Sequence, residues 1–156
     1  MPDALTLTAT TAADLQAIGE RLGRALAVGD VLALVGPLGA GKTTFVQGVA
    51  RGIEVLPDRH VASPTFALVN EHPGRVPLVH ADLYRINDPR ELDELGLADA
   101  FDRAAVAIEW LDRFPDAAPV ERLTIEIAIA ANDTRAVTFR ATGLRAATLM
   151  AAVGAA

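Results

Sequence analysis

The sequence predicts an α/β fold, a single domain with a mixed central β-sheet flanked by helices. Three observations predict it: apolar runs that alternate with segments of helical periodicity, a late pair of β-rich segments around a turn, and a length of 156 residues, which suits one domain. The composition, 51% apolar and 22% charged, is that of a globular protein. We expect the domain to occupy residues 1–156, with its core over about residues 4–142 and a C-terminal helix or tail over 143–156.

The first half of the chain alternates strand and helix signals. Residues 4–8 predict a short strand, and Thr11 or Asp14 can cap the helix that follows it. Residues 31–35, VLALV, are apolar on both faces, as expected of a central strand that is covered on both sides. A second helix is predicted over residues 43–51, and Gly52 closes it.

The second half contains more strand signals. The β-rich runs over residues 61–72 and 74–84 are joined by Pro73-Gly74, which is typical of a hairpin-like connection. Residues 89–101 have a helical pattern. The remaining predicted elements are a buried strand within AAVAIEW (104–110), an antiparallel pair over 123–130 and 136–142 around the turn Asn132-Asp133, and a terminal helix from Leu144.

A glycine-rich turn follows the strand at residues 31–35. Its sequence GPLGAGKT matches G-x-x-x-x-G-K-[ST], the P-loop of nucleotide-binding proteins. Glycines let backbone N–H groups point at a phosphate, and the next helix brings its positive dipole end to the same anion. A flexible connecting loop is the alternative, but the flanking strand and helix favour phosphate binding. The residues expected to contact nucleotide are Gly36, Pro37, Leu38, Gly39, Ala40, Gly41, Lys42, Thr43 and Thr44.

Individual loop residues suit separate tasks. We expect Lys42 to reach the β- and γ-phosphates, where it contributes to catalysis, and the Thr43 hydroxyl to bind Mg²⁺. Pro37 has no backbone N–H, so the loop has one donor fewer and slightly weaker nucleotide affinity is expected.

Asp82 and Glu109 each end an apolar run, and the ligand crevice of open α/β sheets lies outside the carboxyl ends of the strands. One carboxylate would bind metal and the other would orient the attacking water, and spacing does not decide between them.

Three further features lie near these carboxylates. Period-two alternation places His80 on the same strand face as Asp82, where a hydrogen-bonded structural histidine is favoured over a catalytic one. Trp110 directly follows Glu109, so the two side chains point to opposite faces unless the strand has ended; a core tryptophan is the alternative. Residues 63–66 (SPTF) predict a turn, and switch loops of nucleotide hydrolases carry a sensing Thr in such a place.

Composition excludes several classes of function. The absence of cysteine excludes disulfides, thiolate catalysis and Cys-based zinc sites. A net charge of -6 argues against non-specific electrostatic binding of nucleic acid, so DNA is not an expected partner. The start MPDALTLTAT lacks the pattern of a secretory signal, and no apolar run approaches the roughly 18 residues of a spanning helix. We expect a cytoplasmic protein with no membrane partner.

Four stretches occur in order between about residues 30 and 112: GPLGAGKTTFVQG, SPTFALVNEH, HADLYRINDPRELDELGL and IEW. Together they resemble the TsaE family (also called YjeE), small bacterial P-loop ATPases of the synthesis of threonylcarbamoyladenosine (t6A) in tRNA. The resemblance implies ATP or ADP and Mg²⁺ as cofactors and TsaB and TsaD as partner proteins. Contact with tRNA is then expected only indirectly, through those partners.

The resemblance also implies roles for single residues. Thr43 and Glu109 would hold Mg²⁺, while Asp82 and Trp110 would be needed for activity. Arg135 is the nearest match to an arginine that the family associates with the nucleotide. Weak hydrolysis by the isolated chain is expected, because no arginine has an obvious finger role and a partner can complete the site.

Two other functions share the phosphate loop. A nucleotide-gated binding subunit would use ATP or ADP to order residues 63–66 and change its affinity for a partner. A small-molecule kinase needs a basic lid, and the segment 85–103, with three arginines among many acids, makes a poor one.

Overall fold

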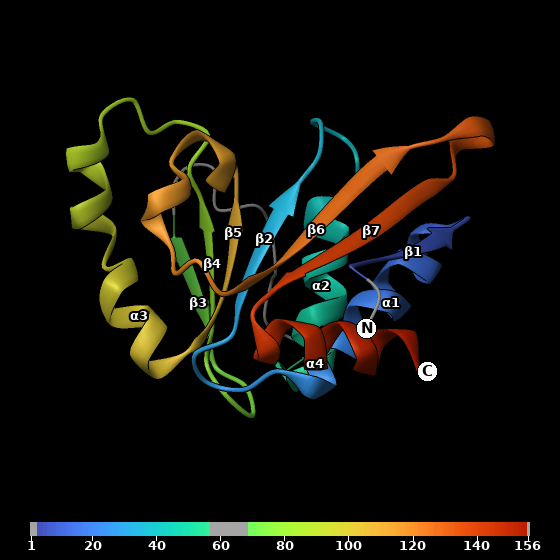
Figure 1. Cartoon of the computed structure of the whole chain (residues 1–156), viewed down its shortest axis with the longest axis horizontal. Helices are drawn as coiled ribbons and strands as arrows, with labels where there is room; N and C mark the ends of the chain where they lie inside the picture. The colour runs from blue at the N-terminus through green and yellow to red at the C-terminus, as the bar shows by residue number, and fades with distance from the viewer. Residues whose placement is uncertain (1–2, 57–68, 156) are drawn as a thin grey trace.

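The computed structural model describes residues 3–56 and 69–155. Within them a seven-stranded mixed sheet runs through the molecule, with helices packed against it (Figure 1). The predicted fold class is confirmed. In chain order the elements are β1 (Ala4–Ala9), α1 (Ala12–Ala25), β2 (Val31–Val35), α2 (Lys42–Gly52), β3 (Val69–His72), β4 (Leu78–Asp82), the 3₁₀ segment η1 (Pro89–Leu95), α3 (Leu97–Arg103), β5 (Ala105–Glu109), the 3₁₀ turns η2 (Leu111–Arg113) and η3 (Pro115–Ala117), β6 (Arg122–Ile129), η4 (Ala131–Asp133), β7 (Arg135–Thr142) and α4 (Leu144–Gly154).

The order of strands in the sheet is β1-β7-β6-β2-β5-β4-β3. The central strands β6, β2, β5 and β4 are parallel to one another. Towards the edges, β3 pairs antiparallel with β4, β7 pairs antiparallel with β6, and β1 pairs antiparallel with β7. In this register Leu34 lies opposite Glu109, and Glu109 lies opposite Asp82. The two carboxylates predicted as metal ligands are therefore neighbours at the carboxyl ends of adjacent parallel strands.

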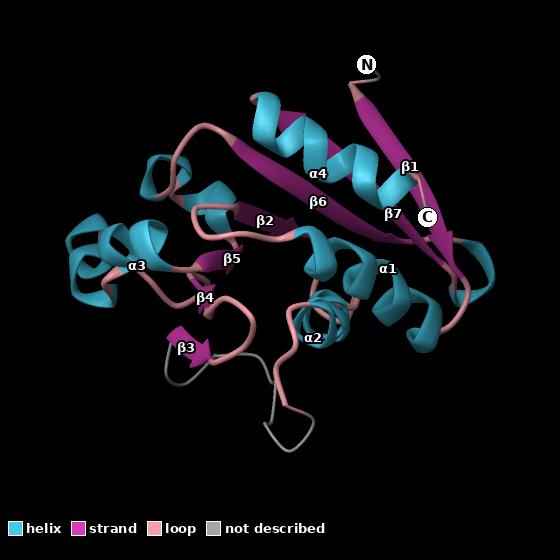
Figure 2. Cartoon of the chain, turned by 90° about the horizontal axis from the view of Figure 1, so that it is seen from below, coloured by secondary structure: helices cyan, strands magenta, loops and turns pink. Residues whose placement is uncertain are grey.

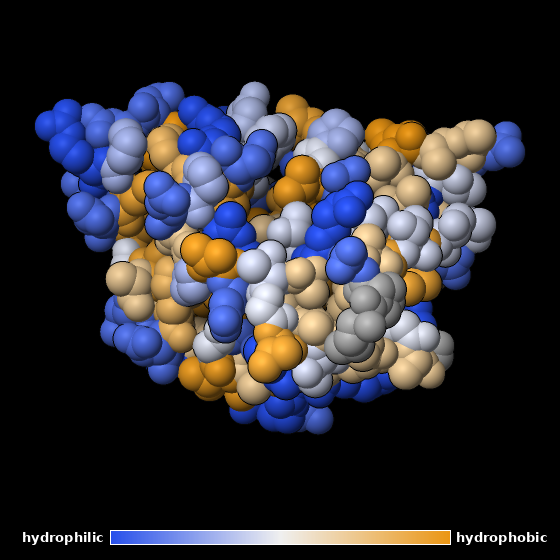
Figure 3. All heavy atoms as spheres, viewed as in Figure 1, coloured by the Kyte–Doolittle hydropathy of each residue, from blue (hydrophilic) through white to orange (hydrophobic). Residues whose placement is uncertain are grey.

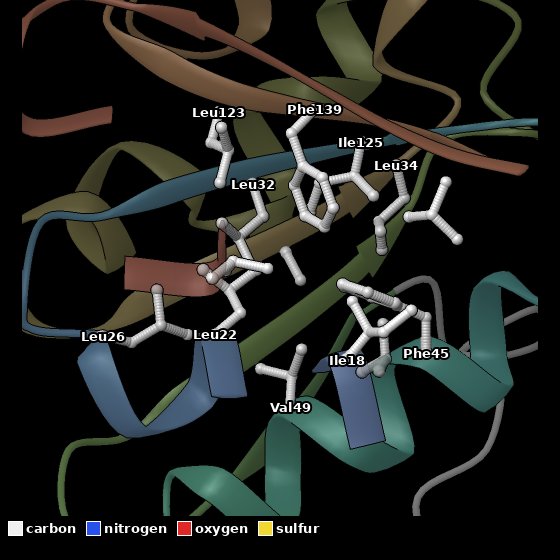
Figure 4. Close-up of a cluster of buried hydrophobic side chains, with 14 of the residues drawn as sticks. Ile18, Leu22, Leu26, Leu32, Leu34, Phe45, Val49, Leu123, Ile125 and Phe139 are labelled. Carbon is white, nitrogen blue, oxygen red and sulfur yellow. The ribbon is translucent and has the colours of Figure 1, made fainter. Parts of the chain in front are cut away.

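Apolar side chains cover both faces of β2, as predicted. Leu32 and Leu34 belong to a cluster shared with α1, α2 and α4, whereas Val31 and Ala33 belong to a cluster shared with α3. Figure 4 shows the first cluster, with side chains of β2, β6 and β7 meeting those of α1 and α2. Figure 2 shows α1 and α2 side by side and α3 at the far end of the sheet. Burial on both faces makes β2 a rigid base for the loop that follows it.

Helices α1 and α2 cross so closely that each needs glycine at the contact. A Cβ added at Gly23 of α1 would lie 2.2 Å from the backbone oxygen of Val49. A Cβ added at Gly48 of α2 would lie 2.1 Å from the backbone oxygen of Gln16. Both distances are far below van der Waals contact, and the atoms they meet are backbone atoms that cannot rotate away. Close packing of α1 thus holds α2, whose first residue is Lys42, in a fixed position.

The substitution Gly48→Ala is expected to destabilise the protein by about 1–3 kcal/mol, because the new methyl group must push two packed helices apart. Urea unfolding followed by circular dichroism measures this change. The matched control is Gly154→Ala in α4, whose added Cβ meets only the end of the Leu5 side chain, at 3.1 Å. The control should stay within about 0.5 kcal/mol of the original protein. Equal stability of Gly48→Ala and the control would contradict the proposed tight crossing.

One predicted helix is divided in the structure. The sequence predicts a helix over residues 89–101, but the chain forms η1 and then α3, with Gly96 between them. Gly96 has a left-handed backbone (φ 74°), which ends a helix and which glycine adopts without strain. The expectation of one continuous helix is therefore wrong.

Other local predictions hold. Thr11 caps α1, since its side chain accepts the N–H of Asp14 at 3.0 Å. β3 and β4 form the predicted antiparallel pair around Pro73-Gly74, and β6 and β7 form the second pair around η4. The part of the predicted strand run over residues 61–68 lies outside the described residues.

The surface agrees with the acidic composition. Figure 3 shows hydrophilic residues prevailing at the left edge of this face, where Figure 1 places α3 and the segment before it. Asp93, Glu94 and Asp102 are exposed there. Such an edge repels a phosphate backbone. In the part of the chain that the structure describes, no helix has both the length and the apolar character to cross a lipid bilayer.

Candidate nucleotide-binding site

The loop between β2 and α2 is built on left-handed glycines. Gly39 (φ 80°) and Gly41 (φ 112°) both adopt positive φ, and a Cβ at Gly41 would also lie 2.5 Å from the side chain of Leu15. The N–H of Ala40 donates to the oxygen of Pro37 at 3.1 Å, which closes a tight turn between them. Residues other than glycine would strain the loop at both positions. The loop therefore curves back over the start of α2, as a phosphate-binding loop requires.

Lys42 is the first residue of α2 and is only 6% exposed. Its ammonium group donates to the backbone oxygen of Gly36 at 2.6 Å and lies 4.2 Å from the centre of the Trp110 ring. Burial lowers the pKa of Lys42, while the charges of Glu109 and Asp82, with Asp112, act in the opposite direction. The site thus holds a largely buried cation next to a backbone oxygen, and a charged acceptor would form a stronger hydrogen bond with it than that neutral oxygen does.

Asp82 and Glu109 lie side by side, as the register requires, and both are buried, at 5% and 3% exposure. One oxygen of Asp82 accepts the backbone N–H of Tyr84 at 2.9 Å. One oxygen of Glu109 lies 2.7 Å from Nε2 of His80, which is itself completely buried. The histidine is hydrogen-bonded near the strand end, in line with the sequence expectation.

Trp110 turns back towards the loop because β5 ends at Glu109. Its backbone is left-handed (φ 63°, ψ 29°), which is uncommon for a bulky residue. The ring reaches Lys42 and also packs against the ring of Tyr84, with centres 5.0 Å apart. Glu109 and Trp110 consequently face the same space. The sequence allowed this arrangement if the strand ends before Trp110; in a continued strand the two side chains would point to opposite faces.

A hollow of about 530 Å³ opens between the loop and the ends of β4 and β5. It brings together most of the predicted site residues, and it adds Tyr84 and Arg85, which sequence reasoning missed. Their signal was their place two and three residues after Asp82 in the stretch HADLYR. The lining residues are Leu38, Gly39, Gly41, Lys42, Thr43, Thr44, Asp82, Tyr84, Arg85, Glu109 and Trp110.

A second hollow, of about 230 Å³, lies on another side of the same loop. Gly39, Gly41 and Thr44 line both hollows, so the two border the same loop. Ala40 and Arg135 line only the second one. Predicted residues that line neither hollow are Gly36 and Pro37, which face a small depression beside Lys42 and Trp110.

Arg135, the first residue of β7, forms hydrogen bonds with the backbone of the loop. Its Nε donates to the oxygen of Ala40 at 2.8 Å, and one terminal nitrogen lies 3.5 Å from the oxygen of Gly39. Asp133 holds the other terminal nitrogen at 3.0 Å. Arg135 therefore contacts the loop backbone from β7, which lies two strands away from β2, and its contact with a nucleotide stays a prediction. The predicted switch segment 63–66 lies outside the described residues.

Comparison with known proteins identifies the family. Residues 9–137, well over half of the chain, match the family model described as threonylcarbamoyl adenosine biosynthesis protein TsaE. The chain belongs to the TsaE family. The resemblance noted in the sequence is thereby confirmed.

TsaE proteins from two bacteria show how close the relationship is. The protein of Bacillus subtilis (strain 168) named tRNA threonylcarbamoyladenosine biosynthesis protein TsaE is 45% identical over 119 residues, 75% of this chain and 73% of the relative. The protein of the same name from Mycobacterium tuberculosis (strain H37Rv) is 35% identical over 145 residues, 86% of this chain and 85% of the relative. The crystal structure of Bacillus subtilis YdiB superposes with a TM-score of 0.84 and 35% identity, covering 99% of this chain and 97% of YdiB.

The donor atoms in this TsaE-family site suit Mg²⁺. Thr43, Asp82 and Glu109 bring a hydroxyl and two carboxylates to the same hollow, and Mg²⁺ prefers oxygen donors, with one or two carboxylates from the protein and the rest from phosphate and water. Within residues 3–56 and 69–155, no group of three or more His, Cys, Asp or Glu side chains could hold a metal on its own. Thr43, Asp82 and Glu109 could therefore supply some of the oxygen ligands of a magnesium ion, but not all of them.

Proposed function

We propose that this protein is a P-loop ATPase that binds ATP or ADP with Mg²⁺ and serves the formation of t6A in tRNA. One observation carries the nucleotide part: the buried Lys42 at the start of α2 shares a hollow with Asp82 and Glu109. The names of the TsaE relatives support the t6A part. The cytoplasm, where tRNA is modified, is the proposed place of action.

The nucleotide spans the two hollows in this proposal. The β- and γ-phosphates occupy the larger one, next to Lys42 and the first N–H groups of α2, where the helix dipole favours negative charge. The nucleoside occupies the smaller one, next to Arg135. Gly39 and Gly41 border both spaces, so one ligand can pass around the loop from one to the other.

The residues that line the hollow have separate roles in ATP hydrolysis. Bound Mg²⁺ neutralises charge that develops on the β- and γ-phosphates. Thr43 and Glu109 hold the ion, and Asp82 orients the attacking water. The two carboxylates end neighbouring strands in register and line the same hollow, as both roles require. Lys42 stabilises the charge on the transferred phosphoryl group. Weak turnover by the isolated chain is expected until a partner completes the site.

TsaB and TsaD proteins are the proposed partners, and tRNA is reached through them. The net charge of -6 and the acidic edge near α3 make direct binding of nucleic acid unfavourable. The exposed Tyr84, 46% accessible and adjacent to Trp110, places an aromatic surface at the mouth of the hollow, where a docked protein could sense the nucleotide.

Arg135→Ala is expected to lower the affinity for ADP about tenfold, which corresponds to about 1.4 kcal/mol. The loop carbonyls of Gly39 and Ala40 would lose the charged donor that holds them, so the loop would be less well ordered for binding. Isothermal titration with MgADP measures the change. Arg140→Ala, an exposed arginine on the same strand, is the control and should bind as the original protein does. Equal affinities for the two variants would contradict the role of Arg135.

The proposed function is tested in bacterial cells depleted of this protein. Mass spectrometry of hydrolysed tRNA should show that t6A falls on depletion and returns when the chain is supplied again. A mixture of the purified chain with TsaB and TsaD should release phosphate from ATP faster than the chain alone. Normal t6A in depleted cells would refute the role in tRNA modification.

A further inference from the structure

His80 is a buried polar side chain with a specific neighbour. It lies in β4, completely shielded from solvent, and its Nε2 is 2.7 Å from Oε2 of Glu109. Among the described residues, its Nδ1 has no hydrogen-bond partner. An apolar side chain would fill the same space without burying a polar atom that lacks a partner. Space filling alone therefore does not account for a histidine at this position. The contact with Glu109 is therefore the feature of His80 that needs an explanation.

The sheet register explains why His80 reaches Glu109. His80 lies opposite Ala107 in the parallel pair of β4 and β5, and Glu109 follows two residues later on the same face. The small side chain of Ala107 leaves room for the imidazole ring to lean along the strands towards the carboxylate. A carboxylate oxygen only accepts hydrogen bonds, so Nε2 carries the hydrogen and donates it to Oε2. The bond restricts rotation of the Glu109 carboxyl group.

We propose that His80 is a positioning residue for Glu109. Its hydrogen bond takes up Oε2 and leaves Oε1 to act in the hollow, which Thr43 also lines. The inference rests on the proposed binding of Mg²⁺ and nucleotide in that hollow. Carboxylates and histidines behind a metal ligand act in this way in many metal sites, and their loss typically weakens metal affinity or activity 10–100-fold.

Two substitutions of His80 separate positioning from simple space filling. The amide nitrogen of glutamine can reach the place of Nε2, whereas the shorter asparagine carries its amide near the place of Nδ1 and cannot reach Glu109. His80→Gln should therefore keep the bond, and His80→Asn should lose it. Both variants lose the aromatic ring and so share whatever packing defect follows from that.

The measurement is the affinity for ADP by calorimetry, with chelator and at increasing Mg²⁺ concentration. In the presence of chelator, all three proteins should bind ADP with the same affinity, because Lys42 and the loop are unchanged. The Mg²⁺ concentration that gives half of the gain in ADP affinity should rise about 10–100-fold in His80→Asn and less than about threefold in His80→Gln. Thermal unfolding of each variant gives the packing defect separately.

Three results would overturn the proposal. One is an unchanged Mg²⁺ requirement in His80→Asn, and another is an equal loss in both variants together with an equal fall in melting temperature. The third comes from the original protein labelled with ¹⁵N-histidine, which keeps the test valid if the variants do not fold: the His80 ring signal should shift with MgADP but not with ADP plus chelator, and an unmoved signal refutes positioning. Failure of the proposed function looks different, since the original protein itself would then bind no ADP.

Discussion

Lys42→Met is expected to lower the affinity for MgADP by at least about 100-fold, which corresponds to about 2.7 kcal/mol. The variant keeps the length of the side chain but removes the ammonium group that lies in the loop, within 2.6 Å of the Gly36 oxygen. Charge-assisted hydrogen bonds to phosphate in a desolvated site are among the strongest in proteins, and no other basic side chain of α2 lines the hollow. Isothermal titration with MgADP measures the loss.

Arg51→Met is the matched control for Lys42→Met. Arg51 lies in the last turn of the same helix, is exposed, and donates to the side chain of Gln16 rather than to the hollow. The control should bind MgADP as the original protein does. Binding by Lys42→Met within about threefold of the control would disprove the assignment of the hollow as a phosphate site.

Lys42 also allows a test without mutation, because it is the only lysine in the chain. Burial lowers its pKa, so a larger fraction of the reactive neutral amine is present at mildly alkaline pH than for an exposed lysine. Acylation of Lys42, followed by mass spectrometry of the peptide that contains it, should slow at least about tenfold when MgADP is added. Phosphate oxygens would both cover the amine and favour its charged form.

Glu109→Gln is expected to reduce ATP hydrolysis about 100- to 1,000-fold while changing the affinity for ADP, measured with chelator, less than about threefold. The amide has the shape of the carboxyl group and can still accept the hydrogen bond of His80, but it lacks the charge that the proposed metal site requires. Nucleotide binding rests mainly on the loop and Lys42, which the substitution does not touch. Phosphate release in the mixture with TsaB and TsaD measures turnover.

Glu126→Gln is the control for this second variant, since Glu126 is an exposed glutamate of β6 outside the lining of the hollow. It should hydrolyse ATP at the original rate. Undiminished turnover in Glu109→Gln would refute the role of Glu109. Normal t6A in cells that contain only Glu109→Gln would favour the nucleotide-gated binding subunit over the ATPase, because hydrolysis would then be dispensable.

The elements that local patterns predict well are those whose residues interact with near neighbours. The apolar run of β2, the spacing of the glycines with Lys42, and the cap at Thr11 all depend on contacts within a few residues. Gly96 shows the limit of this approach. Its left-handed backbone divides a pattern that looks continuous in the sequence, and glycine permits that conformation without requiring it.

The arrangement of the site depends on contacts between distant parts of the chain. Arg135 follows Ala40 by 95 residues, yet it donates a hydrogen bond to the Ala40 oxygen because β7 lies in the same sheet as β2. Tyr84 and Arg85 enter the hollow only because β4 lies next to β5. Spacing along the sequence does not say which strands become neighbours, so local patterns could not show which groups these three residues contact.

The sequence by itself determined the chemistry that is available: one lysine in a glycine-rich turn, a threonine after it, and carboxylates at the ends of apolar runs. Tertiary structure alone decided how these groups meet. The register of β4 and β5 sets Asp82 beside Glu109 and His80 behind it, and the left-handed turn at Trp110 brings an aromatic ring over Lys42. The reason is physical: side-chain type is a local property, whereas distance and desolvation arise only when the sheet assembles and excludes water.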